Sequence, residues 1–232
     1  MQKPELVLET VISDRFAENA YLAHLEGRDD CLVVDPGLDV DRIVNRLTER
    51  RLTPAAILNT HGHADHIGGN AGLKKIWPNC PLIIGADDAD KLADASLNLS
   101  QQYGIPIASP AADRLVGNGE ICSAAGFDLE VLETPGHSLG HVVFVWKAIP
   151  HVIFGGDVLF KGSIGRTDLP DGDFATLRDV IQTRLFQLPD DTIVFPGHGD
   201  PTTIGAEKKH NPFVGEPSGF SDNSSTANDL LS

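Results

Sequence analysis

The chain has 232 residues, 41% of them hydrophobic and 22% charged, a composition typical of a globular protein that buries a core without disulfides. Its formal net charge of −15 argues against nucleic acid as a partner, because phosphate binding needs clustered lysine and arginine. There is no apolar run long enough to span a membrane and no signal-peptide core after Met1, so we expect no membrane association and a cytoplasmic location.

The first half of the chain predicts strands followed by helices. Alternating apolar and β-branched residues indicate three strands, at residues 6–12, 20–25 and 31–34. Asp35-Pro-Gly37 ends the third strand, and Asp39 is expected to cap a helix whose apolar stripe runs from Val40 to Leu47. The next elements are a buried strand, a helix, a short strand and a short helix, at residues 55–59, 68–76, 81–85 and 87–95. Residues 96–118 show little periodicity and predict an irregular insertion.

The second half repeats this order. Three strands are predicted at residues 128–132, 142–146 and 152–154. A helix at 174–186, a strand at 192–195 and a short helix from about Thr203 follow. Two such halves favour an α/β fold in which two sheets pack in the middle and the helices lie outside. We assign residues 1–214 to one domain and residues 215–232 to a polar tail that we expect to be disordered.

The run His61-Gly-His63-Ala-Asp65-His66 directly follows the predicted strand 55–59. His61 and His63 are two apart and point to one side of an extended segment, while Asp65 and His66 lie where the chain turns. One short loop can therefore serve two neighbouring metal ions. Imidazole and carboxylate ligands suit zinc, iron or manganese, and the absence of thiolates argues against a closed structural zinc site.

Three further ligand-type residues stand just after predicted strands: His137, Asp157 and His198. The two oxygens of Asp157 allow it to bridge two ions. His141 begins a strand, and we weigh contact with substrate or support of the ligands equally against a plain structural role. The remaining histidines are expected to be polar loop residues, namely His24, His151 and His210.

This ligand set predicts hydrolysis. Two close divalent ions lower the pKa of a bound water, hold hydroxide between them and polarise a carbonyl or phosphoryl oxygen. No serine, cysteine or lysine is placed as a nucleophile, and the three cysteines neighbour no histidine. We therefore expect direct attack by the metal-bridging hydroxide, with Asp65 and Asp157 as the carboxylates of the catalytic centre.

The order His61-Gly-His-Ala-Asp-His66, His137, Asp157, His198 resembles the metallo-β-lactamase superfamily, whose fold is an αββα sandwich. Within it, four further stretches are similar to the glyoxalase II group: Asp35-Pro-Gly37, Thr134-Pro-Gly-His-Ser-Leu-Gly-His141, Gly156-Asp-Val-Leu-Phe160 and Gly165-Arg-Thr-Asp168. The ending Pro196-Gly-His-Gly199 is similar to that of its short, single-domain bacterial members.

The resemblance implies two divalent ions, zinc in the first place and iron or manganese as alternatives. One ion would be held by His61, His63 and His137. The other would be held by Asp65, His66 and His198, with Asp157 as the bridge. It also implies a small-molecule thioester substrate such as S-D-lactoylglutathione, cleaved to D-lactate and glutathione. Arg166 corresponds to a basic residue that contacts the glutathione portion, and Asp168 stands where the group has a tyrosine.

Other functions stay open at this point. The stretches Asn59-Thr-His-Gly-His-Ala-Asp-His66 and Gly165-Arg-Thr-Asp168 also resemble the iron-dependent persulfide (sulfur) dioxygenases, which use a single iron. Hydrolysis of lactones or phosphodiesters is a further alternative within the superfamily. A non-enzymatic binding module is disfavoured, because all seven ligand-type residues are present.

Overall fold

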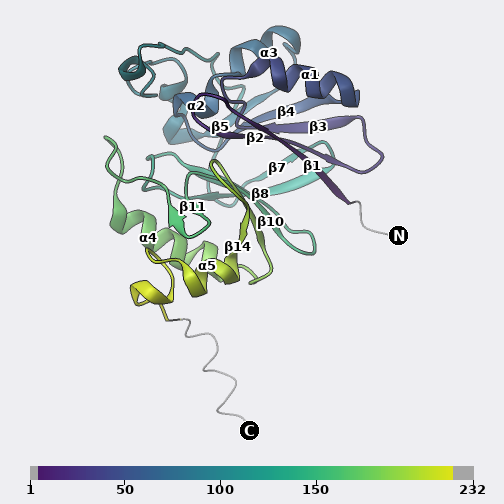
Figure 1. Cartoon of the computed structure of the whole chain (residues 1–232). Coiled ribbons are helices and arrows are strands. Elements are labelled where there is room, and N and C mark those ends of the chain that lie inside the picture. Colours follow the sequence, from purple (N-terminus) through teal and green to yellow (C-terminus); the bar gives the residue numbers. More distant parts are fainter. Residues whose placement is uncertain (1–4, 222–232) are drawn as a thin grey trace.

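Two six-stranded sheets face each other in the computed structural model, which describes residues 5–221 of the chain (Figure 1). The first sheet has the strand order β1 (Leu6–Ile12), β2 (Asn19–Leu25), β3 (Asp30–Val34), β4 (Thr53–Asn59), β5 (Leu82–Gly85) and β6 (Arg114–Val116). Strands β1 to β3 pair antiparallel, whereas β3 to β6 pair parallel.

The second sheet is formed by later strands, in the order β14 (Thr202–Thr203), β13 (Ile193–Pro196), β10 (Val152–Gly156), β9 (Val142–Trp146), β8 (Phe127–Glu133) and β7 (Ile121–Ala124). Only β10 and β13 pair parallel in it. The short strands β11 (Leu159–Phe160) and β12 (Ser163–Ile164) form a separate hairpin beside this sheet.

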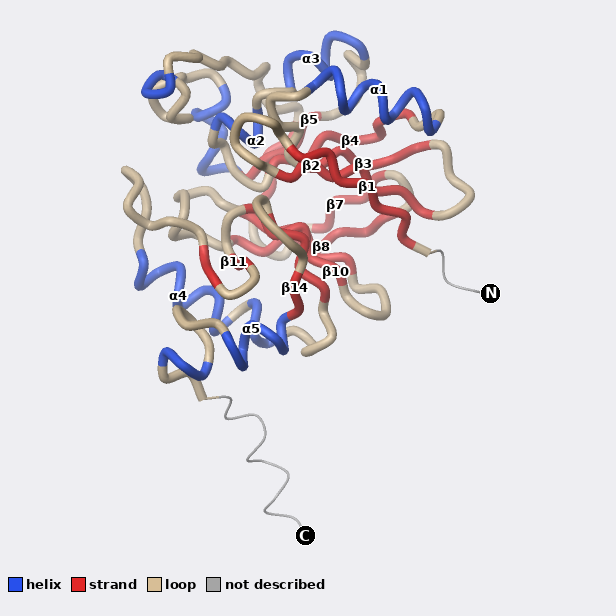
Figure 2. Tube along the Cα trace, in the orientation of Figure 1, coloured by secondary structure: helices blue, strands red, loops and turns tan. Residues whose placement is uncertain are grey.

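Helices cover the outer face of each sheet (Figure 2). The first sheet carries α1 (Val40–Arg50), α2 (Ala64–Ile67) and α3 (Asn70–Ile76). The second carries α4 (Phe174–Thr183) and α5 (Ile204–His210). Four short 3-10 helices complete the described chain, namely η1 (Ala86–Leu92), η2 (Gln101–Tyr103), η3 (Leu185–Gln187) and η4 (Glu216–Ser218). The layers confirm the predicted αββα sandwich.

Strand β3 shows how the sequence builds these layers. Leu32 and Val34 point into the apolar core between the two sheets, whereas Cys31 and Val33 face the helices. Successive side chains of a strand point to opposite faces, so a strand buried on both faces needs an uninterrupted apolar run. On the helix side, Ile43 of α1 joins the same buried cluster as Cys31 and Val33.

Most predicted elements are confirmed within a residue or two, and the differences have local causes. The helix predicted at 68–76 is two helices, α2 and α3, and the first begins early enough to include Asp65 and His66. Asp39 stands at the N-cap of α1, but its Oδ2 accepts a hydrogen bond from the backbone N–H of Asp14 (2.8 Å) rather than from the helix. The insertion predicted at 96–118 also contains η2 and the edge strand β6.

The predicted tail begins with residues that pack against the domain. Within it, η4 is followed by Phe220, whose ring lies 5.0 Å from that of Phe186, centroid to centroid. Residues 222–232 lie outside the described part, so disorder there stays a prediction. No helix within residues 5–221 is long and apolar enough to cross a membrane.

The three cysteines offer a test of this packing. Cys31, Cys80 and Cys122 are free and buried, and burial raises the pKa of Cys31 to about 12 and that of Cys80 to about 11. Because the thiolate is the reactive form, native protein should not react with an aromatic disulfide reagent at about pH 8, and denatured protein should titrate all three thiols. Fast reaction of one thiol in native protein would mean that its strand opens locally.

Candidate metal centre

The seven predicted ligand residues come from loops that follow four strands. His61 and His63 follow β4, and the next residues, Asp65 and His66, lie on α2. His137 follows β8, Asp157 follows β10 and His198 follows β13. These strand ends meet at one edge of the sandwich, where α2 of the first half and β11 of the second line the same cleft (Figure 1).

The structure brings all seven side chains together in three overlapping groups whose ligand atoms lie within 4.8 Å of one another: His61, His63 and His137; His61, His66 and Asp157; Asp65, His66 and His198. Asp157 stands between the outer groups. Its Oδ2 lies 3.6 Å from Nε2 of both His137 and His198, and its Oδ1 lies 3.5 Å from Nε2 of His66. A carboxylate that bridges two ions needs such a position between their ligands.

Hydrogen bonds at Nδ1 orient His61 and His66. The Thr60 hydroxyl donates its one hydrogen to Asp35 Oδ2 (2.7 Å), so the ring of His61 must donate its Nδ1–H to Thr60 Oγ1 (3.1 Å). His66 donates its Nδ1–H to the same carboxylate oxygen of Asp35 (3.0 Å). In both rings Nε2 is therefore the nitrogen that is left to face the metal groups.

His137 and His198 are oriented in the same way by backbone carbonyls. Nδ1 of His137 donates to the Arg166 carbonyl (2.9 Å), and Nδ1 of His198 donates to the Ala17 carbonyl (3.3 Å). The Nε2 atom of His198 then faces Asp65 Oδ2 at 3.3 Å. His63 differs, because its Nδ1 lies 2.9 Å from Nε2 of His137 and thus points into the first group.

Three polar atoms that face the centre are buried without a hydrogen-bond partner among the described residues: His61 Nε2, His66 Nε2 and Asp157 Oδ1. Buried polar atoms are normally paired, because an unpaired one loses the free energy of its hydration. Nitrogen and carboxylate ligands that converge in this way fit divalent ions of the zinc, iron or manganese type.

The electrostatics of the centre favour added positive charge. Burial acts to lower the pKa of His66, but Asp157, Asp65 and Asp35 around it raise that pKa well above its usual value. Burial acts to raise the pKa of Asp157, but the neighbouring histidines, led by His66, hold it well below its usual range. A proton on His66 therefore occupies a place that suits a cation, and metal binding would release it.

Asp35 is a functional residue that the predicted site omitted. It is buried, and besides the Thr60 hydroxyl and His66 its carboxylate accepts the backbone N–H of Thr60 (2.8 Å). Such carboxylate–histidine pairs fix the ring that binds a metal. The signal was present in the sequence, because Asp35 follows a buried strand just as Asp157 does.

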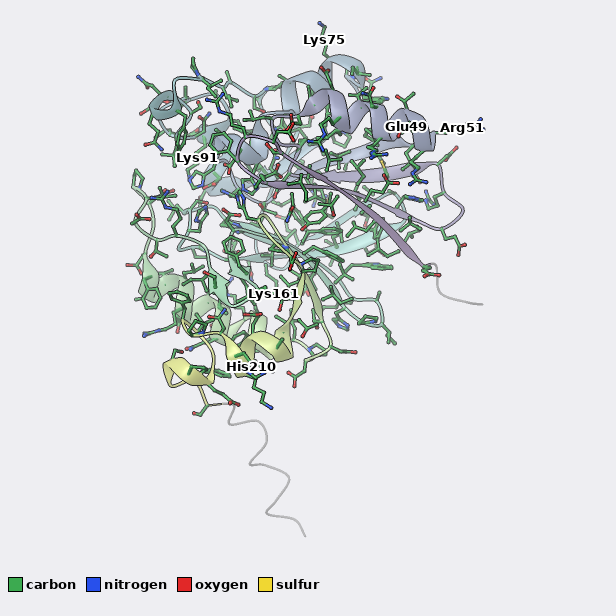
Figure 3. The ribbon with its side chains drawn as sticks, viewed as in Figure 1. Glu49, Arg51, Lys75, Lys91, Lys161 and His210 are labelled. Carbon is green, nitrogen blue, oxygen red and sulfur yellow. The ribbon has the colours of Figure 1, made fainter. Side chains whose placement is uncertain are left out.

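Asp88 of η1 is a second residue that the predicted site omitted. Its hydrogen bonds link the loop of His61 and His63 to the loop of His137. Its Oδ2 accepts the Gly62 N–H (2.7 Å) and the Ser138 hydroxyl (2.8 Å), and its Oδ1 accepts the Gly140 N–H (2.8 Å). Lys91 also donates to Oδ1 (2.6 Å) and lies in the upper half of Figure 3, on the same side as α2. No sequence signal marked Asp88, which stands at the start of the short helix predicted at residues 87–95.

His141 is fully buried behind the centre and does not line the cleft. Its ring stacks on His61 at 4.9 Å, and its Nε2 accepts the backbone N–H of Asp157 (3.1 Å). Because Nε2 accepts, the ring hydrogen is on Nδ1, which donates it to Thr134 Oγ1 (2.9 Å). Neither ring nitrogen is therefore available to a substrate. Of the roles weighed from the sequence, support of the ligands fits this position and contact with substrate does not.

Gly156 explains how Asp157 enters the centre. Its φ of +47° is unusual for a side-chain-bearing residue, and a Cβ there would lie 2.3 Å from Thr60 Oγ1 and 2.7 Å from His141 Nε2. Only glycine lets β10 approach both groups closely enough to place the next residue between the two metal groups.

Arg166 lines the cleft, as predicted for a substrate-binding residue, but it is already paired. Its Nε and Nη2 donate to the two carboxylate oxygens of Asp168, at 2.9 and 3.0 Å. The cleft has a volume of about 290 Å³ and opens over the metal groups.

The family model described as the metallo-beta-lactamase superfamily matches residues 13–198. This chain therefore belongs to the metallo-beta-lactamase superfamily. It is 39% identical to the hydroxyacylglutathione hydrolase GloC of Haemophilus influenzae, over 91% of this chain and 99% of that protein. It is also 43% identical to the probable metallo-hydrolase YqgX of Bacillus subtilis, over 88% of this chain and 93% of that protein.

Solved structures show the same fold. The BLEG-1 B3 metallo-beta-lactamase is 37% identical with a TM-score of 0.85, covering 90% of this chain and 99% of that one. TTHA1623, crystallised in a di-iron-bound form, is 35% identical with a TM-score of 0.78, covering 88% and 99%. ETHE1 from Myxococcus xanthus is 27% identical with a TM-score of 0.73, covering 90% and 85%.

Replacing Asp88 tests its hold on the two loops. Asp88→Asn keeps the shape of the side chain but removes the charge that Lys91 and two backbone N–H groups share. We expect metal affinity to fall roughly 10- to 100-fold, as for other groups that orient ligands. Metal retained after dialysis against a graded chelator series measures this.

The matched control is Asp113→Asn, which removes a carboxylate bound to Lys74 and to the Leu82 N–H far from the ligand loops. It should leave metal affinity unchanged. Equal losses in the two variants would show that Asp88 contributes only general stability.

Proposed function

We propose that this metal-dependent hydrolase cleaves thioesters at a binuclear centre. His61, His63 and His137 would hold one ion, Asp65, His66 and His198 would hold the other, and Asp157 would be shared between them. The observation that carries the proposal is the shared orientation of four rings, each fixed through Nδ1 so that Nε2 points inward, with Asp157 between the two groups. Zinc is the first candidate, and the di-iron form of TTHA1623 supports iron as the alternative.

Bound divalent ions of this kind lower the pKa of water and polarise the carbonyl oxygen that is attacked. The protein's part is to hold the ligands in place before the substrate arrives. Asp35 and Thr60 orient His61 and His66, and His141 holds the backbone of Asp157. Catalysis depends on such preorganised groups, because they need no rearrangement during the reaction.

The cleft favours a thioester over an amide or a phosphodiester. A thiol has a pKa of about 8.5, so it can leave as thiolate without receiving a proton, whereas an amine or alcohol needs an acid. Within the described lining of the cleft, every imidazole and carboxyl group belongs to the proposed ligands. No further histidine, aspartate or glutamate there is free to protonate a leaving group.

The first substrate to consider is a glutathione thioester such as S-D-lactoylglutathione. This is supported by the Haemophilus influenzae relative, whose name is hydroxyacylglutathione hydrolase GloC and which is 39% identical over 99% of its own length. We place the enzyme in the cytoplasm, where three free cysteines are expected to stay reduced.

A persulfide dioxygenase is the second candidate, supported by the resemblance of residues 59–66 and 165–168 to that group. Such an enzyme needs one iron. Here both outer groups of ligands are complete: His61, His63 and His137 form one, and Asp65, His66 and His198 form the other. Lactone hydrolysis also stays open, since it needs the same attack on a carbonyl carbon.

A substrate panel with metal-analysed protein distinguishes these functions. We expect two ions per chain and faster hydrolysis of thioesters than of lactones, β-lactams or phosphodiesters. One iron per chain, together with oxygen uptake on glutathione persulfide, would replace the hydrolase by a dioxygenase.

The bridging role of Asp157 can be tested separately. Asp157→Ala removes a carboxylate that lies 3.6 Å from ligand nitrogens of both outer groups, so we expect loss of both ions and a fall in activity of at least about a hundredfold, with the fold retained. Metal analysis and circular dichroism measure the two effects. Asp190→Ala, at an exposed carboxylate paired with Lys208, is the control for loss of one charge. Two ions per chain in the Asp157 variant would refute the bridge.

A further inference from the structure

The wall of the cleft above the metal groups is apolar. Its side chains come from four separate segments and are listed here in chain order: Phe16, Leu99, Tyr103, Phe160 and Leu169. The rings of Phe16 and Tyr103 meet edge to face at 5.3 Å, and the Tyr103 side chain is 46% exposed. An apolar group bound here would remove aromatic surface from water, which is the main favourable contribution in small-molecule sites.

The few cationic side chains at this wall are already paired with carboxylates. Arg166 is the one cation among the described residues that line the cleft, and Asp168 binds its guanidinium through two parallel hydrogen bonds. Asp168 occupies the Nε–Nη2 edge of the guanidinium, so a substrate carboxylate would meet only the remaining N–H groups, close to the negative charge of Asp168. The nearby cation Lys91 is buried and bound to both Asp88 and Asp171, at 2.6 Å each.

We propose that the enzyme prefers thioesters that are uncharged and carry an apolar group, such as an aromatic ring or a short alkyl chain, over thioesters of anionic glutathione. Phe16, Tyr103 and Leu169 form the binding surface for that group, and the pairing of Arg166 with Asp168 weakens binding of glutathione. This inference rests on the proposed thioesterase function and names its substrate class.

The first experiment compares two substrates on metal-loaded wild-type enzyme. One is the phenylacetyl thioester of N-acetylcysteamine, which is uncharged, and the other is S-D-lactoylglutathione. We expect kcat/KM to be at least about tenfold higher for the uncharged thioester, a ratio within reach of one apolar pocket. Equal values, or a preference for the glutathione thioester, would overturn the inference and leave the thioesterase function standing.

Variants then separate the two parts of the wall. Asp168→Asn removes the negative charge beside the Arg166 guanidinium, so kcat/KM for S-D-lactoylglutathione should rise about threefold through KM, as expected for an exposed ion pair, with the phenylacetyl substrate unaffected. Tyr103→Ser should lower kcat/KM for the phenylacetyl substrate about tenfold and leave the glutathione substrate unchanged. Parallel changes for both substrates in either variant would show a structural effect and contradict the proposal.

The chain contains a matched control for the charge change. Arg28 and Asp30 form the same two-bond pair at the same spacing, at 2.6 and 2.7 Å, where the turn after β2 leads into β3. Asp30→Asn should change neither substrate. If it raised turnover of the glutathione thioester as much as Asp168→Asn does, the effect would come from net charge and the proposed role of the Arg166 pair would fall.

A binding measurement without turnover distinguishes failure of the inference from failure of the thioesterase function. Calorimetry with two non-hydrolysable thioethers, S-benzyl-N-acetylcysteamine and S-methylglutathione, should give a lower Kd for the benzyl compound and a loss of that preference in Tyr103→Ser. If no thioester is hydrolysed, the proposed function fails, and the calorimetry still decides which class the cleft binds. Tighter binding of S-methylglutathione would overturn the inference on its own.

Discussion

The hydrogen bonds of the Asp35 carboxylate hold one side of the metal centre in place. Two of them come from Thr60 and one from His66, and through the Thr60 hydroxyl the same carboxylate also sets the tautomer of His61. A free imidazole can turn and can carry its hydrogen on either nitrogen, so without this network Nε2 of both rings would not be held toward the metal groups. Asp35 lies at the end of β3, beside the end of β4, and the parallel pairing of these strands brings it to Thr60.

The other side of the centre depends on contacts between the halves of the molecule. Asp88 belongs to the first half and binds Ser138 and Gly140 of the second. In the opposite direction, Asn19 of β2 donates to the backbone carbonyls of Pro196 and Gly199 on either side of His198. The apolar core between the sheets brings the halves together, and these polar contacts set the positions of the ligand loops across the gap. Small shifts would matter here, because metal ligation tolerates little error in position.

Much of the fold was predictable because its strands are buried on both faces. Runs such as Cys31–Val34 and Val142–Trp146 have no polar interruption, so their type and limits follow from composition. The short edge strands β6, β7 and β14 were not predicted, since two to four residues carry too little periodicity and depend on a neighbouring strand for their hydrogen bonds. The break between α2 and α3 was also missed. Gly68 and Gly69 lie there against Leu38 and the backbone of Pro36, and these contacts form only when the loop before α1 packs over the two glycines.

The sequence by itself determined the fold class, the seven ligand-type residues and the strand ends that carry them, because these depend on residue type and local spacing. Tertiary structure decided which ring nitrogen each histidine presents, that Asp157 lies between the two groups, and that His141 supports the centre from behind. It also revealed Asp35 and Asp88 as the groups that orient the ligand loops, and it paired Arg166 with Asp168. These features depend on distances between segments far apart in the chain, and such distances are set only when the two sheets pack against each other.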